Sequence, residues 1–188
     1  MKKRFITFTI ALLVFLAGCS GGGDSLDRAL ALRSRMVSSN GCTFDAEVTA
    51  DYGDKLYIFA MSCQADSQGN VAFTVTAPES IAGITGTVSE QGGQLTFDDT
   101  ALAFELLADG QFSPVSAPWL LVHTLRSGYL TSCAQVEDGL LLSIDDSYEA
   151  DALNLSVYLG QDDLPTAAEV SWQGRLILSL TVKNFAFQ

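Results

Sequence analysis

Few side chains in this chain of 188 residues are of the kinds that act as catalytic bases or nucleophiles. His123 is the only histidine, so a serine or cysteine nucleophile would have to use it as its base. No G-x-S-x-G motif, the usual setting of a serine nucleophile, accompanies it. We therefore interpret His123 as a structural or solvated residue.

Three acidic pairs at the ends of expected strands could bind a metal ion or act in catalysis. They are Asp98-Asp99, Asp145-Asp146 and Asp162-Asp163. Carboxylates can bind Ca²⁺, and two of them about 5–9 Å apart can hydrolyse a glycosidic bond. The spacing of a calcium loop is absent, as are a phosphate-binding loop, zinc-ligand spacing and a dinucleotide fingerprint. Solvated turn residues are the favoured interpretation. We expect no metal, no cofactor and no enzyme, and a hydrolase is the weakest of three functional classes.

Cys19 is the residue whose context predicts a definite modification. Lys2, Lys3 and Arg4 precede an apolar run and then Leu16-Ala17-Gly18-Cys19, the layout of a secretory signal. This ending resembles the lipobox of bacterial lipoproteins, which implies cleavage before Cys19 and acylation of its thiol.

Two alternatives to a lipoprotein signal fit residues 1–19 less well. A transmembrane anchor needs about 20 apolar residues, and residues 5–17 are only 13. A plain cleaved signal would leave Cys19 as a free thiol. We therefore expect a leader at 1–18, a lipidated cysteine with a flexible tether at 19–24, and a single domain at 25–188. Such a protein belongs to the cell envelope, on the outer face of the cytoplasmic membrane or in an outer membrane if the cell has one.

The charge balance excludes one class of partner. Twenty-two acidic residues stand against ten lysines and arginines, and three of those ten lie in the leader. A surface this acidic is repelled by phosphate backbones and anionic lipids. We exclude nucleic acid, and expect the acylated Cys19 to provide the membrane attachment.

The elements that carry these residues follow from periodicity. A capping signal at Asp24-Ser25 and a stop at Asn40-Gly41 predict one helix, and the apolar segment 119–130 predicts a second. Alternation of apolar and polar residues predicts strands at 42–50, 55–63, 71–77, 84–89, 94–98, 102–106, 136–144, 153–159, 168–172 and 175–187. This mainly β (α+β) pattern favours an open antiparallel half-barrel of about ten strands with two helices on its concave face. A two-sheet β-sandwich is the alternative.

The first hairpin predicts a register and a disulfide. A two-residue turn at Tyr52-Gly53 would pair Val48 with Tyr57, Ala46 with Phe59, Phe44 with Met61 and Cys42 with Cys63. A Cys42–Cys63 bridge is then feasible and would contribute about 3 kcal/mol, although one bulge would remove the opposition. Cys133 has no expected partner.

The segment 73–84 carries a family resemblance. A strand ends at Pro78, and Ile81 to Ile84, Ile-x-Gly-Ile, starts the next one. With the leading helix and the long first hairpin, this order resembles the LolA/LolB-like lipoprotein carriers and their Gram-positive relatives, from about Arg28 to the end. The resemblance implies an unclosed β-barrel capped by helices around an apolar cavity that binds acyl chains or hydrophobic partners, without enzymatic activity.

Apolar side chains on the expected inner face are the candidates for such a cavity. They are Phe44, Val48, Tyr57, Phe59, Phe73, Val75 and Trp119. They could line a cavity of about 300–1,000 Å³ or fill an ordinary core. The first case predicts an anchored lipoprotein that binds a lipid, another hydrophobic ligand or a partner envelope lipoprotein. The second predicts a structural or protein-interaction module without a ligand.

Overall fold

The computed structural model describes residues 22–53, 55–98, 100–104, 107–108 and 111–188, so the expected leader and Cys19 lie outside the described residues. Eleven antiparallel strands form one sheet in the order β6-β5-β4-β3-β2-β1-β13-β12-β11-β10-β9. The strands are β1 (Gly41–Asp51), β2 (Leu56–Asp66), β3 (Val71–Ala77), β4 (Thr85–Ser89), β5 (Gly92–Phe97), β6 (Thr100–Phe104), β9 (Tyr129–Val136), β10 (Gly139–Asp145), β11 (Leu153–Leu159), β12 (Pro165–Trp172) and β13 (Arg175–Phe187). Two further short strands, β7 (Leu107–Ala108) and β8 (Gln111–Phe112), pair only with each other.

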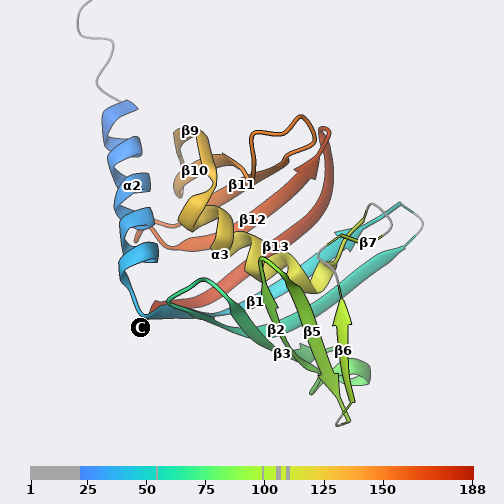
Figure 1. Ribbon diagram of the computed structural model, residues 1–188. Coiled ribbons are helices and arrows are strands. Elements are labelled where there is room, and N and C mark those ends of the chain that lie inside the picture. Colours follow the sequence, from blue (N-terminus) through green and yellow to red (C-terminus); the bar gives the residue numbers. More distant parts are fainter. Residues whose placement is uncertain (1–21, 54, 99, 105–106, 109–110) are drawn as a thin grey trace, which may run out of the picture.

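The sheet is strongly curved and open (Figure 1). Its edge strands β6 and β9 do not pair with each other within the described part of the chain. The predicted open half-barrel is therefore confirmed, and the two-sheet sandwich is wrong because all eleven long strands belong to one hydrogen-bonded sheet.

Two helices accompany the concave side of this sheet. The helix α3 (Ala117–Ser127) lies within the curve, and α2 (Gly22–Ser38) stands beside one end of the strands (Figure 1). Since α2 already begins at Gly22, residues 22–24 of the expected flexible tether are helical, and Asp24 stabilises the first turn through the helix dipole. None of the helices in the described residues has the length and hydropathy needed to cross a bilayer.

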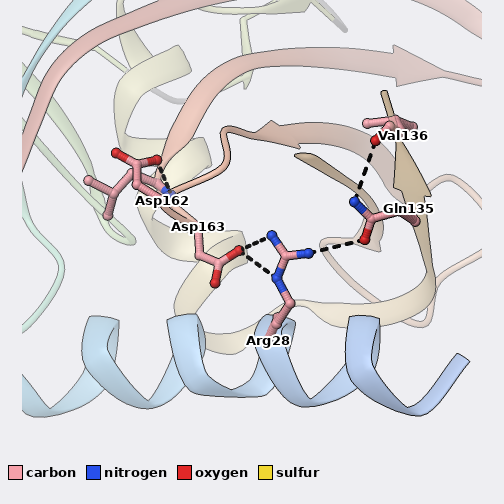
Figure 2. A network of polar contacts seen from close by, with 6 residues as sticks. Arg28, Gln135, Val136, Asp162 and Asp163 are labelled. Carbon is pink, nitrogen blue, oxygen red and sulfur yellow. Dashed lines mark hydrogen bonds and ion pairs between the residues drawn. The ribbon is translucent and has the colours of Figure 1, made fainter. Parts of the chain in front are cut away.

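Side chains near both ends of α2 fix it to the sheet. The Arg28 guanidinium donates from Nε to Oδ1 of Asp163 at 2.8 Å and from Nη1 to Oε1 of Gln135 at 3.1 Å (Figure 2). Near the other end, the guanidinium carbon of Arg35 lies 4.3 Å from the centre of the Phe187 ring. These contacts join α2 to β9, to the loop after β11 and to the last strand.

The core lies between α3 and the inner face of the sheet. Period-two burial places one set of side chains from each central strand inward, as in β11, where Leu153, Leu155, Val157 and Leu159 are buried. Eight of the eleven residues of α3 are buried, and the polar side chains of the helix that reach the solvent are confined to a narrow strip that contains His123, Arg126 and Ser127.

The register of the first hairpin differs from the prediction by two residues. Val48 lies opposite Phe59 and Ala46 opposite Met61. The backbone N–H of Tyr52 donates to the carbonyl of Lys55 at 3.0 Å, so the chain reverses after Tyr52, one residue later than the predicted turn at Tyr52-Gly53. An even shift keeps every side chain on its predicted face.

The same shift removes the predicted disulfide. Cys42 lies opposite Ala65 and Cys63 opposite Phe44. Both cysteines are buried free thiols in the structure. The prediction of directly opposed sulfurs was wrong because it depended on a turn at Tyr52-Gly53, and the turn lies one residue later.

The ends of the strands define two ends of the half-barrel. By the antiparallel pairing, the turns β1–β2 (52–55), β3–β4 (78–84), β5–β6, β10–β11 (146–152) and β12–β13 (173–174) share one end, which we call the rim. The turns β2–β3 (67–70), β4–β5 (90–91), β9–β10 (137–138) and β11–β12 (160–164) share the other, the base. The C-terminal end of α2 leads into β1 at the base.

Candidate functional site

An apolar cleft of about 410 Å³ opens near the rim. Its lining contains no charged side chain and consists of Tyr52, Tyr57, Phe59, Val75, Ile81, Ile84, Leu95, Phe112, Ser113, Pro114 and Val115. This hollow is the feature of the described residues best suited to a hydrophobic ligand, since ligand pockets are concave, largely apolar and about 300–1,000 Å³ in volume.

The strand alternation explains how the sheet contributes to the cleft. Tyr57 and Phe59 are two residues apart on β2, and Val75 lies on the neighbouring β3, so all three project from the same face. Phe59 is 8% exposed, whereas Tyr57, nearer the rim, is 44% exposed. Phe59 therefore belongs to the floor of the cleft and Tyr57 to its mouth.

Short irregular segments complete the wall. The 3-10 turn η1 (Glu79–Ile81) and the residue that precedes β4 supply Ile81 and Ile84. The 3-10 turn η2 (Pro114–Ser116) supplies Pro114 and Val115, and leads directly into α3. Both turns begin after or at a proline, whose fixed φ and missing N–H favour such breaks over continued strands.

Tyr52 connects the first hairpin to the segment before α3. Its hydroxyl donates a hydrogen bond to the backbone carbonyl of Phe112. The Tyr52 and Tyr57 rings meet edge to face with centroids 6.1 Å apart. Burial raises the pKa of Tyr52 to about 12, and the proximity of Tyr57 adds to this. The Tyr52 hydroxyl is therefore neutral, and able to donate, throughout the physiological pH range.

The structure distributes the seven predicted cavity residues among different environments. Tyr57, Phe59 and Val75 line the apolar cleft. Phe44 and Val48, on the neighbouring β1, are packed in the core, 2% and 0% exposed. Phe73 is also packed in the core, 4% exposed, and belongs in addition to the lining of a separate hollow of about 480 Å³ among threonine and glutamine side chains.

Trp119 lies in a polar cleft of about 360 Å³ near the base, with His123, Arg126 and Glu90. The rings of Trp119 and His123 are stacked with centroids 4.8 Å apart. The Arg126 guanidinium is committed to backbone carbonyls, those of Met36 and of Ser67, the latter at 2.8 Å. In the described residues no group of three or more His, Cys, Asp or Glu side chains gathers to hold a metal ion.

Sequence reasoning missed more than half of the cleft lining. Ile81 and Ile84 were noticed only for their resemblance to a family motif, and residues 111–115 fell in a segment interpreted as a loop. Pro114 followed by the apolar Val115 was the available signal, because a proline next to apolar residues before a helix is typical of a buried entry turn.

Large apolar side chains are exposed on both faces of the sheet at the rim, since Leu56 and Ile58 alternate with the cleft residue Tyr57 along β2. Seven of the large apolar residues with high exposure belong to strand ends or turns at the rim: Leu56, Tyr57, Ile58, Phe97, Tyr148, Trp172 and Leu176. Where exposed apolar side chains gather on one surface, they mark interaction sites.

Comparison with known proteins gives a likeness of fold. No family model matches the chain, and no curated protein matches it. Among solved structures, a LolA superfamily protein from Nitrosomonas europaea is 9% identical, covers 85% of this chain and 93% of its own, and has a TM-score of 0.46. The lipoprotein LppX from Mycobacterium tuberculosis is 11% identical over 86% of this chain and 93% of its own, with a TM-score of 0.42.

An uncharacterised conserved protein from Thermus thermophilus is similar at 13% identity, with 87% of this chain and 88% of its own covered and a TM-score of 0.47. The expected resemblance to the LolA superfamily is thus present among the solved structures. At these identities the likeness concerns the fold, and the site must be judged from its own residues.

Proposed function

We propose that this chain is a cell-envelope lipoprotein that binds a hydrophobic ligand, an acyl chain of a lipid, in the apolar cleft. The observation that carries the proposal is the cleft itself, about 410 Å³ without a charged lining residue. Each methylene that leaves water contributes about 0.8 kcal/mol. Eight buried methylenes would therefore contribute about 6 kcal/mol before the cost of ordering the chain.

The anchoring part of the proposal comes from the sequence. The leader 1–18 is removed and the thiol of Cys19 is acylated, which holds the domain at a membrane of the cell envelope. Only two residues separate Cys19 from Gly22, the first residue of α2. The helix and the domain behind it would therefore lie close to the bilayer surface.

Binding without catalysis is the chemistry that the cleft supports. Its polar groups are the hydroxyls of Tyr52, Tyr57 and Ser113, and the Tyr52 hydroxyl is already bonded to Phe112. A nucleophile activated by a base requires a neighbouring proton acceptor such as histidine. His123 lines the separate polar cleft near the base. We propose that the protein is not an enzyme.

A second candidate function is docking of a partner envelope lipoprotein or another protein. The exposed apolar residues of the rim favour it, especially Tyr57 and Phe97, which are 44% and 57% exposed and lie two residues from the cleft residues Phe59 and Leu95. In that case the rim would be an interface and the cleft would accept a side chain of the partner. The filled-core module expected as an alternative differs from this candidate, because it would have no open cleft for a partner to enter.

Anchoring is tested by the mass of the N-terminal tryptic peptide of protein purified from its own membranes. The proposal predicts a peptide spanning 19–28 that carries acyl groups, and release of a Cys19→Ala variant from the membrane. An unmodified peptide that begins elsewhere would contradict it.

Ligand binding is tested with a photoreactive fatty acid added to the full-length protein in nanodiscs. The proposal predicts crosslinks in peptides that contain residues 57–59 and 112–115. Competition by unlabelled fatty acid should remove them. Labelling confined to the exposed strand ends, without competition, would favour the protein-docking candidate and contradict ligand binding.

A further inference from the structure

A second hollow adjoins the apolar cleft, and its chemistry is different. It measures about 300 Å³, and Phe112 belongs to the lining of both. Its apolar part consists of Phe112, Leu153, Trp172 and Ile177. Opposite these lie Asp146, Glu149 and Asp151 from the β10–β11 loop. We call this space the acidic hollow.

The loop that carries the three carboxylates is held in place. The N–H of Leu153 donates to Oδ1 of Asp146 at 2.8 Å, and the N–H of Asp146 donates to the carbonyl of Leu153 at 3.0 Å. The N–H of Ala152 donates to the carbonyl of Glu149 at 3.2 Å. Since these bonds use the backbone and one oxygen of Asp146, the carboxylates of Glu149 and Asp151 remain available to a ligand.

Among the described residues, no lysine or arginine forms an ion pair with the carboxylates of this hollow. In the described part of the chain the ion pair is that of Arg28 with Asp163, at the base. Arg175 is the basic residue next to the hollow in sequence, beside Trp172. Its guanidinium lies against Gly53, with Nη2 3.2 Å from the position that a Cβ would take there. Gly53 belongs to the β1–β2 turn, which lies on the far side of β13 from the β10–β11 loop.

The negative charge of the acidic hollow therefore favours a positively charged head group on a ligand whose tail occupies the apolar cleft. Three carboxylates repel a phosphate or carboxylate group and attract an amine or quaternary ammonium. Trp172, which is 38% exposed, adds an aromatic face of the kind that binds such cations. The shared Phe112 places both hollows within reach of one amphiphilic molecule.

We propose that the ligand is a cationic amphiphile, a lipid whose acyl chain fills the apolar cleft and whose amine or ammonium group lies across Phe112 in the acidic hollow. This inference rests on the proposed function, because it assigns a head group to the lipid that the cleft binds. It extends that function by predicting discrimination between lipids that have the same tail.

The test uses three photoreactive probes with one alkyl chain and different head groups: trimethylammonium, hydroxyl and sulfate. Each is titrated against the full-length protein in phosphatidylcholine nanodiscs, and crosslinks in the peptides of the cleft are quantified. We expect the ammonium probe to give half-maximal labelling at the lowest concentration and the sulfate probe at the highest.

The variant Glu149→Gln/Asp151→Asn isolates the head-group contribution, because both residues are exposed and Asp146 keeps its backbone bond. Glu137→Gln/Asp138→Asn is the matched control, with the same charge change in an exposed turn at the base. We expect the first variant to weaken labelling by the ammonium probe about five-fold and to leave the hydroxyl probe unchanged. The control should change neither. Because the wild type and both variants are compared with the same probe, the partition of that probe into the nanodisc affects all three equally.

The outcomes separate the two proposals. If all three probes label the cleft equally and the Glu149→Gln/Asp151→Asn variant behaves as the wild type, the head-group inference is overturned and the proposed function stands. If no probe labels the cleft, both are overturned. If the base control weakens the ammonium probe as much as the first variant does, the effect is that of net charge and the acidic hollow has no role.

Discussion

The hydroxyl of Tyr52 donates a hydrogen bond to the backbone carbonyl of Phe112, sixty residues along the chain. This contact joins the turn of the first hairpin to the segment that leads into α3, and both residues line the apolar cleft. Phe112 also lines the acidic hollow. One hydrogen bond thus positions the wall that the two hollows share.

Replacing Tyr52 by phenylalanine should loosen that wall. The Phe112 carbonyl would lose its partner, so we expect a loss of about 1 kcal/mol in the free energy of unfolding and faster amide exchange at residues 112–116. Denaturant unfolding and hydrogen exchange measure both. Tyr57→Phe is the control, because the hydroxyl of Tyr57 forms no hydrogen bond with another described residue. Equal effects of the two substitutions would show that the Tyr52 bond has no special role.

An aspartate introduced at the floor of the cleft should affect folding, whereas an aspartate introduced in its wall should affect ligand binding. Phe59 is nearly buried opposite Val48, so Phe59→Asp should prevent folding, because a carboxylate there lacks solvent and a partner. Ile81 is only partly buried on the exposed turn η1. Ile81→Asp should fold and lose about ten-fold in affinity for a fatty acid. Circular dichroism and binding titration distinguish the two, and a wild-type melting curve for Phe59→Asp would contradict the packing described here.

The Arg28 contacts should control the attachment of α2 (Figure 2). The guanidinium donates to Asp163 and Gln135, and the carboxylate of Asp163 raises the pKa of Arg28. Arg28→Ala should speed amide exchange in the first half of α2, and the effect should shrink in high salt, because the pair is partly exposed and screened. Exchange that is unchanged, or equally fast throughout the chain, would disprove a local attachment.

The buried thiols should be unreactive in the folded protein. Burial raises the pKa of Cys42 to about 11 and raises that of Cys63 further, and the thiolate is the reactive form. At about pH 8, near the ordinary pKa of a free thiol, we expect iodoacetamide to modify the half-buried Cys133 well before the other two. Peptide mass spectrometry reports the order. Rapid modification of Cys63 in native protein would contradict the burial described here.

The same shifts predict a pH dependence of stability. Because the folded pKa of Cys42 lies above its ordinary value near 9, the unfolded chain loses this proton first as the pH rises. Its contribution is fully present below about pH 9 and is lost as the pH rises towards 11. Cys42→Ala should therefore flatten the decline in the unfolding free energy between these values. An identical decline in the variant would exclude the thiol as its cause.

The sequence predicted the faces of the strands better than their partners. Alternation along 42–50 and 55–63 placed Val48 and Phe59 inward correctly, because side-chain period depends only on local backbone geometry. Their pairing required the position of the turn to within one residue, and composition does not reveal the bond from Tyr52 to Lys55 that marks this position. The curvature that makes the half-barrel was anticipated from the order of elements and the count of strands.

The site was less predictable because it is built from irregular segments. Tyr57, Phe59 and Val75 could be found by periodicity, whereas Ile81, Phe112 and Val115 come from turns without a period. β9 was missed altogether, since Tyr129–Val136 lacks the alternation of a strand with one buried face, and its burial pattern shows why: it is an edge strand that is mostly exposed.

The most direct test of the account is the native mass spectrum of the full-length protein purified gently from its own membranes, beside the Ile81→Asp variant. The account predicts that the wild type retains an additional mass, which extracts into organic solvent as a lipid with a single type of head group, and that the variant loses it. A wild-type mass with no ligand beyond the acylated Cys19, and no uptake of an added uncharged long-chain alcohol, would contradict a ligand-binding cleft.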